Sequence, residues 1–64
     1  MKKTPHPIYT LYRKTPPTER RGVTVIVAYW HGWDGVDARF VRGSAAWWAM
    51  KAGRDNRKSE RWLK

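Results

Sequence analysis

Residues 22–35 have the sequence GVTVIVAYWHGWDG, and the conformation of this stretch decides the architecture of the chain. Its apolar run, which has no helical period, consists of Val23, Val25, Ile26 and Val27. Runs of β-branched residues between glycines are typical of strands. Residues 22–30 are therefore predicted to form a central strand, and because both of its faces are mostly apolar, we expect both to be covered.

The residues that follow predict a β-hairpin. Residues 36–42 (VDARFVR) alternate apolar and polar side chains as a half-buried strand does. Residues 31–35 supply a connection of ordinary length, in which Asp34-Gly35 is a strong turn dipeptide. We expect Trp30 and Trp33 to pack across the end of this hairpin. The alternative is an exposed Trp33 that contacts a partner from the hairpin tip.

The N-terminal segments predict an arm, a strand and a loop. Residues 1–7 contain two prolines and no periodicity, which predicts a flexible basic arm. Residues 8–15 (IYTLYRKT) are rich in aromatic and β-branched residues, so they are predicted to form a short edge strand. Residues 16–21 (PPTERR) form a loop in this interpretation, because consecutive prolines remove backbone donors and fix φ.

The C-terminal third predicts one amphipathic helix over residues 44–63. Ser44 is a good N-cap, and the alanines that follow favour a helix. Gly53 could end the helix, but the pattern of charge continues beyond it. At about 100° per residue, one side of the helix collects Lys51, Arg54, Arg57, Lys58, Arg61 and Lys64. The opposite side collects Ala45, Trp48, Ala49, Ala52, Trp62 and Leu63.

The two adjacent tryptophans separate on this helix. Trp48 belongs to the alanine side and is expected to pack on the sheet. Trp47 lies with the cations, where an indole can stack against a guanidinium or support a nucleobase. The alternative is a helix rolled about its axis, in which Trp47 and Met50 are buried.

Together these elements predict an α+β fold. A small antiparallel sheet of two to three strands (8–15, 22–30 and 36–42) carries one helix (44–63), in a single β-β-β-α domain over residues 8–64. The chain has 64 residues and no cysteine, so its core must be built largely from five Trp, three Tyr and one Phe. An unpaired sheet edge or apolar face could also form a homodimer.

The charge of the chain points to an anionic partner. Fourteen Lys and Arg against five Asp and Glu give a formal net charge of +9. The positive charge is concentrated in residues 1–21 and 44–64, and the middle is neutral. Nucleic acid, an acidic protein and an anionic membrane surface are the partners that such a balance favours. No segment has the length of a membrane span or a signal peptide, so we expect a cytoplasmic protein.

The sequence offers little for catalysis or cofactors. His31, Asp34 and Ser44 do not form a recognisable set of nucleophile, base and orienting group, so no enzyme is expected. The candidate ligands His6, His31, Asp34 and Asp37 lack the spacing of a known metal site. No phosphate-binding glycine loop is present either, and we expect no cofactor.

Two binding functions are predicted, the first being contact with DNA or RNA. Phosphates would meet the cationic helix face, the basic N-terminal segment and the cations of the predicted loop, and the arginines of the predicted third strand would extend the patch. The candidate residues are Lys51, Arg54, Arg57, Lys58, Arg61, Trp47, Arg20, Arg21, Arg39 and Arg42. In its order of elements alone, the predicted fold is similar to the small sheet-based, AP2-like arm-binding domains of integrases.

The alternative function is docking on an acidic patch of another protein, as a small phage-type inhibitor or regulator of an enzyme. Trp, Tyr and Arg dominate the energetics of protein–protein interfaces, and the chain is rich in all three. A membrane-surface role is less favoured, because the apolar side of the helix is mostly alanine.

Overall fold

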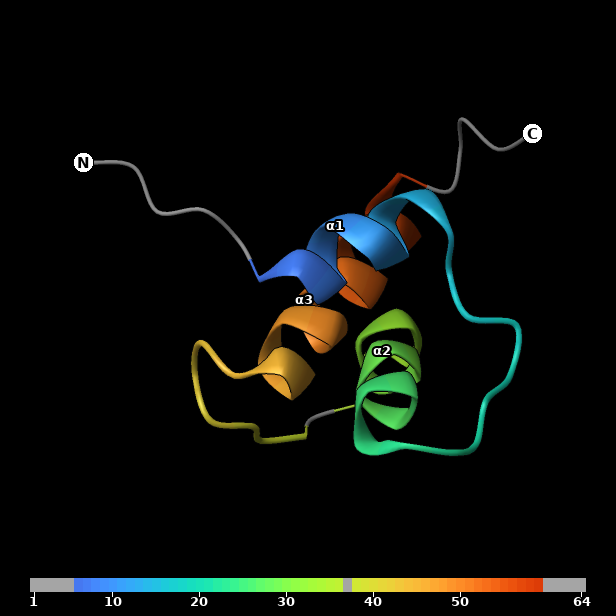
Figure 1. Cartoon of the computed structure of the whole chain (residues 1–64). Coiled ribbons are helices and arrows are strands. Elements are labelled where there is room, and N and C mark those ends of the chain that lie inside the picture. The colour runs from blue at the N-terminus through green and yellow to red at the C-terminus, as the bar shows by residue number, and fades with distance from the viewer. Residues whose placement is uncertain (1–5, 37, 60–64) are drawn as a thin grey trace.

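The structure, a computed structural model, describes residues 6–36 and 38–59 and contains three helices (Figure 1). They are α1 (Pro7–Lys14), α2 (Thr24–Asp34) and α3 (Ala45–Lys58). No strand occurs in these ranges, so the predicted α+β fold is wrong. The chain is a small all-α domain, in which α3 packs against both of the other helices. No described helix has the length and apolar character needed to cross a membrane.

The predicted edge strand over residues 8–15 is the helix α1. His6 is its N-cap, and the Nδ1 atom of this residue accepts a hydrogen bond from the Ile8 amide (3.1 Å). Pro7 opens the helix at a position where a missing amide costs nothing. On this helix the aromatic residues Tyr9 and Tyr12, three residues apart, lie on the side that packs against the core. Of the predicted arm over residues 1–7, residues 1–5 lie outside the described chain, and the last two residues begin α1.

The predicted central strand over residues 22–30 is wrong as well, because most of it is α2. The cap of this helix is poor, since Val23 offers no side-chain hydrogen bond. Its other end is well defined, because Gly35 takes the left-handed conformation (φ 76°) that closes a helix. Asp34-Gly35 therefore ends a helix instead of turning a hairpin. Trp30 and Trp33 still contact each other, with ring centroids 5.9 Å apart, but from successive turns of α2.

Small residues explain why a β-branched segment is helical here. Ala28 and Gly32 on α2, and Ala49 and Gly53 on α3, are each four residues apart and buried. A Cβ atom at Gly32 would collide with the backbone oxygen of Met50, and one at Gly53 would collide with that of Tyr29. The two helices thus touch backbone to backbone, which only glycine permits. This contact stabilises α2 beyond its intrinsic propensity.

Tyr29 lies at the centre of the core and is fully buried. Its ring makes T-shaped contacts with the rings of Tyr12 on α1 (centroids 5.4 Å apart) and Trp30 (4.8 Å). The buried amide of Asn56 on α3 connects all three helices. Its Nδ2 donates to the Tyr12 carbonyl and to the Tyr29 hydroxyl (2.9 Å each), and its Oδ1 accepts from Arg13 (2.7 Å). Every polar atom of this side chain is therefore satisfied, as burial requires.

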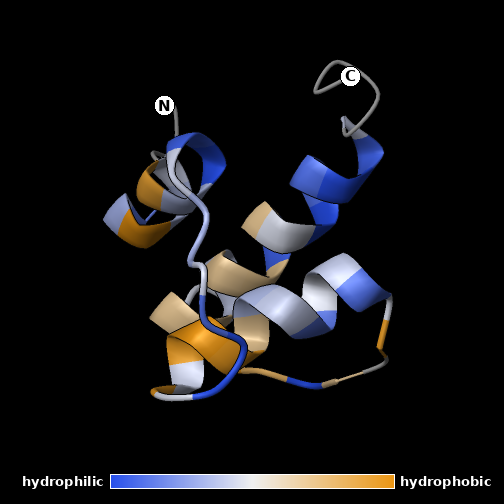
Figure 2. Cartoon of the chain, turned by 90° about the vertical axis from the view of Figure 1, so that its right-hand side faces the viewer, coloured by the Kyte–Doolittle hydropathy of each residue, from blue (hydrophilic) through white to orange (hydrophobic). Residues whose placement is uncertain are grey.

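The helix predicted over residues 44–63 is present as α3. Ser44 is its N-cap, as predicted, and the hydroxyl accepts a hydrogen bond from the Trp47 amide (3.2 Å). The helix continues through Gly53 and ends at Lys58, while residues 60–63 lie outside the described chain. Figure 2 shows that hydrophilic residues gather toward the C-terminal end of α3.

The predicted strand over residues 36–42 is wrong. Its described residues form part of the loop between α2 and α3, where Phe40 packs against the core and Val41 is 78% exposed. Without a sheet in the described chain, the predicted route to a homodimer through a sheet edge loses its basis. The similarity in element order to the integrase domains is also wrong, because it required three strands before the helix.

Candidate functional site

The most coherent set of predicted site residues lies on one face of α3. Trp47, Lys51, Arg54 and Lys58 recur at spacings of four, three and four, which places them in one row along the helix. We call this row the outer face of α3. The buried residues Ala49, Gly53 and Asn56 lie on the opposite side of the same helix.

Cations of the outer face remain available for a partner. Arg54 and Lys58 are exposed, and neither forms an ion pair, a hydrogen bond or a ring contact within the described chain. Lys51 lies 4.0 Å from Asp55, whose carboxylate also accepts a 2.6 Å hydrogen bond from the Tyr9 hydroxyl. A helix face with unpaired like charges repels itself until an anion approaches. The outer face is therefore suited to an anionic ligand.

Arg42 extends the outer face from the loop that precedes α3. The Arg42 guanidinium lies over the Trp47 ring at 5.9 Å from the centroid. Trp47 in turn meets the edge of Trp48, with centroids 4.9 Å apart. Trp48 packs against Tyr9 of α1 at 5.3 Å, where a sheet had been predicted. Trp47 thus lies on the cationic side of α3. Met50, which the alternative of a rolled helix would bury, is partly buried and packs against the core.

The other predicted cations lie elsewhere. Arg57 turns toward α2, where it donates to the Trp33 carbonyl (2.9 Å) and lies over the Trp33 ring (5.8 Å). Arg20 lies over Trp30 at 4.4 Å and 3.4 Å from the Asp34 carboxylate. Arg21 and Arg39 are exposed in the two interhelical loops, and Arg61 lies outside the described residues. Of the cations predicted to share one side of the C-terminal helix, Lys51, Arg54 and Lys58 therefore form the row, and Arg57 does not.

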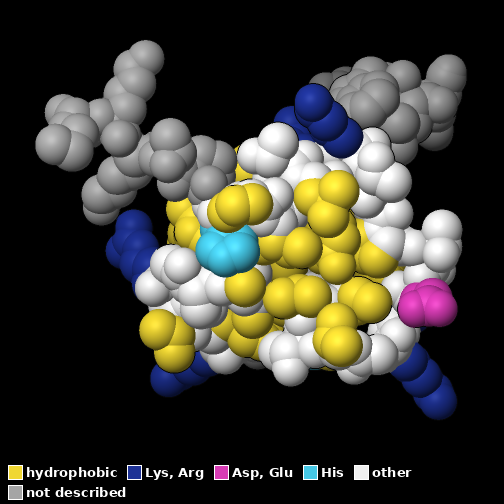
Figure 3. Space-filling view, in the orientation of Figure 1, with side chains coloured by type: hydrophobic (Ala, Val, Ile, Leu, Met, Phe, Trp, Pro, Cys, Tyr) yellow, Lys and Arg dark blue, Asp and Glu magenta, His cyan; other side chains and the backbone are white. Residues whose placement is uncertain are grey.

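A second feature of the surface is the apolar face seen in Figure 3. Hydrophobic side chains occupy its centre, and lysines and arginines project from its margins. Leu11 of α1 (52% exposed) and Val23 next to α2 (62%) are among the large apolar residues that the molecule leaves accessible. Apolar surface of this kind is a common feature of contact sites between proteins.

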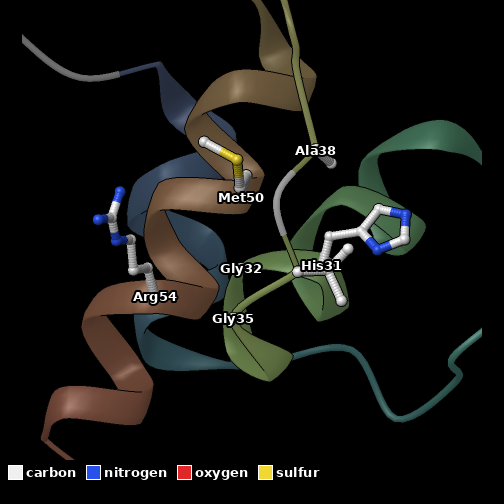
Figure 4. Close-up of a pocket in the computed structure, with 7 residues that line it drawn as sticks. His31, Gly32, Gly35, Ala38, Met50 and Arg54 are labelled. Carbon is white, nitrogen blue, oxygen red and sulfur yellow. The ribbon is translucent and has the colours of Figure 1, made fainter.

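A first hollow lies beside the contact of α2 and α3 and has a volume of about 260 Å³. Its lining consists of His31, Gly32, Gly35, Val36, Ala38, Met50 and Arg54. Figure 4 shows that the His31 imidazole and the Arg54 guanidinium point away from each other, on opposite sides of the hollow. Because its polar groups do not converge, this hollow has no arrangement for chemistry.

A second hollow of about 190 Å³ is aromatic, and we call it the tryptophan pocket. Its lining consists of Arg13, Lys14, Pro16, Tyr29, Trp30, Trp33 and Asn56. The pocket was not predicted from the sequence, because Trp30 and Trp33 were expected to pack across the end of a hairpin. In the structure Trp33 is half-buried and stacks at 6.5 Å on Tyr29. The available signal was the spacing of Trp30 and Trp33, three residues apart on one helix side.

All three tyrosines are held in the neutral form. Burial raises the pKa of Tyr29, and this effect outweighs the hydrogen bond from Asn56 and the nearby charge of Arg13, which lower it. Burial also raises the pKa of Tyr12. The pKa of Tyr9 is raised by burial and then by the hydrogen bond to the Asp55 carboxylate. At neutral pH the Tyr9 hydroxyl therefore donates to Asp55, and the neutral Tyr29 hydroxyl accepts from Asn56.

Among the described residues, no group of three or more His, Asp or Glu is placed to hold a metal ion. No protein-family model, no curated protein and no solved structure matches the chain. The functional proposal therefore depends on the geometry and charge of the chain itself.

Proposed function

We propose that this chain is a small nucleic-acid-binding module that contacts phosphates through the outer face of α3. The observation that carries the proposal is the row of cations on that face, in which Arg54 and Lys58 have no intramolecular partner in the described chain. Arg42 and Trp47 extend the row toward the start of the helix. The net charge of +9 favours the same class of partner.

The dimensions of the row suit a nucleic-acid backbone. Lys51 and Lys58 are separated by two turns, or about 10 Å along the helix axis. Phosphates of one strand follow each other at about 3.4 Å along a duplex axis, so the row spans several of them. Four phosphate contacts, by Arg42, Lys51, Arg54 and Lys58, correspond to a slope of about −3 for a single strand and about −4 for a duplex in a plot of log binding constant against log salt concentration. Binding is therefore expected to weaken steeply as salt is raised.

The experiment compares two charge reversals of equal size in a titration with labelled oligonucleotides. Arg54→Glu places a negative charge in the middle of the outer face, so binding is expected to weaken about tenfold or more at low salt. Arg21→Glu is the matched control, because Arg21 is also exposed but lies in the loop between α1 and α2. Arg54→Glu combined with Lys58→Glu is expected to abolish binding without unfolding the helices.

Two results would contradict the proposal. One is the absence of oligonucleotide binding by the unaltered chain at low salt. The other is equal weakening by Arg54→Glu and Arg21→Glu, which would show that only net charge matters.

Docking on an acidic protein surface is the second candidate. The apolar centre of the face in Figure 3, with basic residues at its margins, favours it. In that case oligonucleotides would fail to bind at low salt, and Leu11→Glu would weaken capture of the partner more than Arg54→Glu would.

A further inference from the structure

We propose that the tryptophan pocket binds one unpaired base of a single-stranded nucleic acid. This inference rests on the proposed function and specifies which form of nucleic acid the chain prefers. The pocket is separate from the outer face of α3, and none of the lining residues belongs to that face.

The walls of the pocket provide surfaces for stacking. Trp30 and Trp33 come from successive turns of α2, with ring planes 71° apart. Tyr29 already stacks on Trp33, so a flat ring is expected to lie against the indole surface that lines the pocket. Pro16 contributes from the loop after α1, and the buried residues Tyr29 and Asn56 lie deeper. Aromatic side chains of this kind bind bases of any identity, because every base has a π face.

The size of the pocket limits its occupant. A volume of about 190 Å³ is below the range of about 300–1,000 Å³ that is usual for drug-sized ligands. One planar ring system is therefore the suitable occupant, rather than a helix or a strand of a partner. The hydrogen-bonding groups of Asn56 are already engaged, so we expect little discrimination between bases.

The charges around the pocket select for an occupant attached to anions. Arg13 and Lys14 line the pocket, and no acidic residue does. Arg57 lies over the Trp33 ring and Arg20, which also pairs with Asp34, lies over the Trp30 ring, so two more cations adjoin the indoles of the pocket. A base inside the pocket would bring its flanking phosphates close to these basic lining residues. A duplex does not present such a base, because its bases are stacked and paired.

The test uses three labelled ligands of equal length at low salt: oligothymidine, an abasic strand with the same phosphates, and a duplex. The intact chain is expected to bind oligothymidine about tenfold more tightly than the abasic strand, because stacking is lost in the latter. Trp33→Leu, confirmed as helical by circular dichroism, is expected to remove this difference. Phe40→Leu, in the loop between α2 and α3 and outside the pocket lining, is the control that should preserve it.

Each other outcome has a defined meaning. Equal binding of oligothymidine and the abasic strand by the intact chain would overturn the pocket proposal and leave phosphate contact by α3 standing. Tighter binding of the duplex, or of a peptide of alternating Glu and Phe, would also overturn it. If none of the nucleic-acid ligands binds, the proposed function itself fails. The comparison on the intact chain decides the matter even if Trp33→Leu does not fold.

Discussion

Gly53 occupies a position where the absence of a side chain determines how two helices meet. Its Cα faces the backbone of α2 so closely that a methyl group would meet the Tyr29 oxygen. Gly32 faces the Met50 oxygen in the same way from the other helix. At both positions the collision is with backbone, which cannot move aside as a flexible side chain can. These two residues therefore fix the distance between α2 and α3.

Gly53→Ala is expected to destabilise the domain by about 3 kcal/mol, because the methyl group forces the two helices apart. Helix propensity alone gives the opposite sign, since alanine in a helix is favoured over glycine by about 1 kcal/mol. Urea unfolding followed by circular dichroism measures the difference. A stabilised variant would show that the helices do not touch at this residue.

The tyrosines provide a second test at the scale of single residues. Their pKa values are raised above the ordinary value of 10.0, so the folded state keeps these protons while the unfolded state loses them. The free energy of unfolding is therefore unaffected below about pH 9 and falls as the pH rises through and above 10. Tyrosinate absorbance should give midpoints above 10 in the folded chain and near 10 in denaturant. A tyrosine that titrates normally in the folded chain would contradict this packing.

At the scale of elements, the sequence predicted α3 but not the other two helices. Residues 45–58 were predictable because local signals agree: a capping serine, alanines and a regular amphipathic pattern. Residues 22–30 were mistaken for a strand because the β-branched run of α2 has no helical period. The tertiary contact of α2 with α3 through Ala28 and Gly32 overrides the strand preference of this segment. The four-residue spacing of these two small residues was the helical signal in the sequence. For α1, the signal was Pro7 at the first helical position.

Val23→Asp tests the conformation of this segment directly. Val23 has the extended backbone of an N-cap (φ −68°, ψ 161°) and is 62% exposed, but its side chain forms no capping hydrogen bond. Aspartate there can accept from the first free amides of α2 and is expected to stabilise the domain by about 1 kcal/mol. Val23→Ala, which cannot cap, is the control, and thermal unfolding is the measurement. A loss of stability on Val23→Asp alone would favour an extended segment.

At the scale of the whole molecule, helix packing divides the cations into groups with different surroundings. Arg13 is bound to Asn56, while Arg20 and Arg57 lie over tryptophans of α2. The outer face of α3 keeps Arg54 and Lys58 accessible. The row on α3 was predictable because it depends only on helical periodicity. The tryptophan pocket was not, because it requires three segments to be brought together by a fold that the sequence did not indicate.

Mapping of backbone amide shifts by NMR, as an abasic strand is added, tests most directly where the phosphates bind. The account predicts that the largest shifts occur at Trp47, Lys51, Arg54 and Lys58 and are reversed by added salt. Shifts centred on Leu11 and Val23 would contradict it, because they would place the contact at exposed apolar side chains outside the outer face of α3.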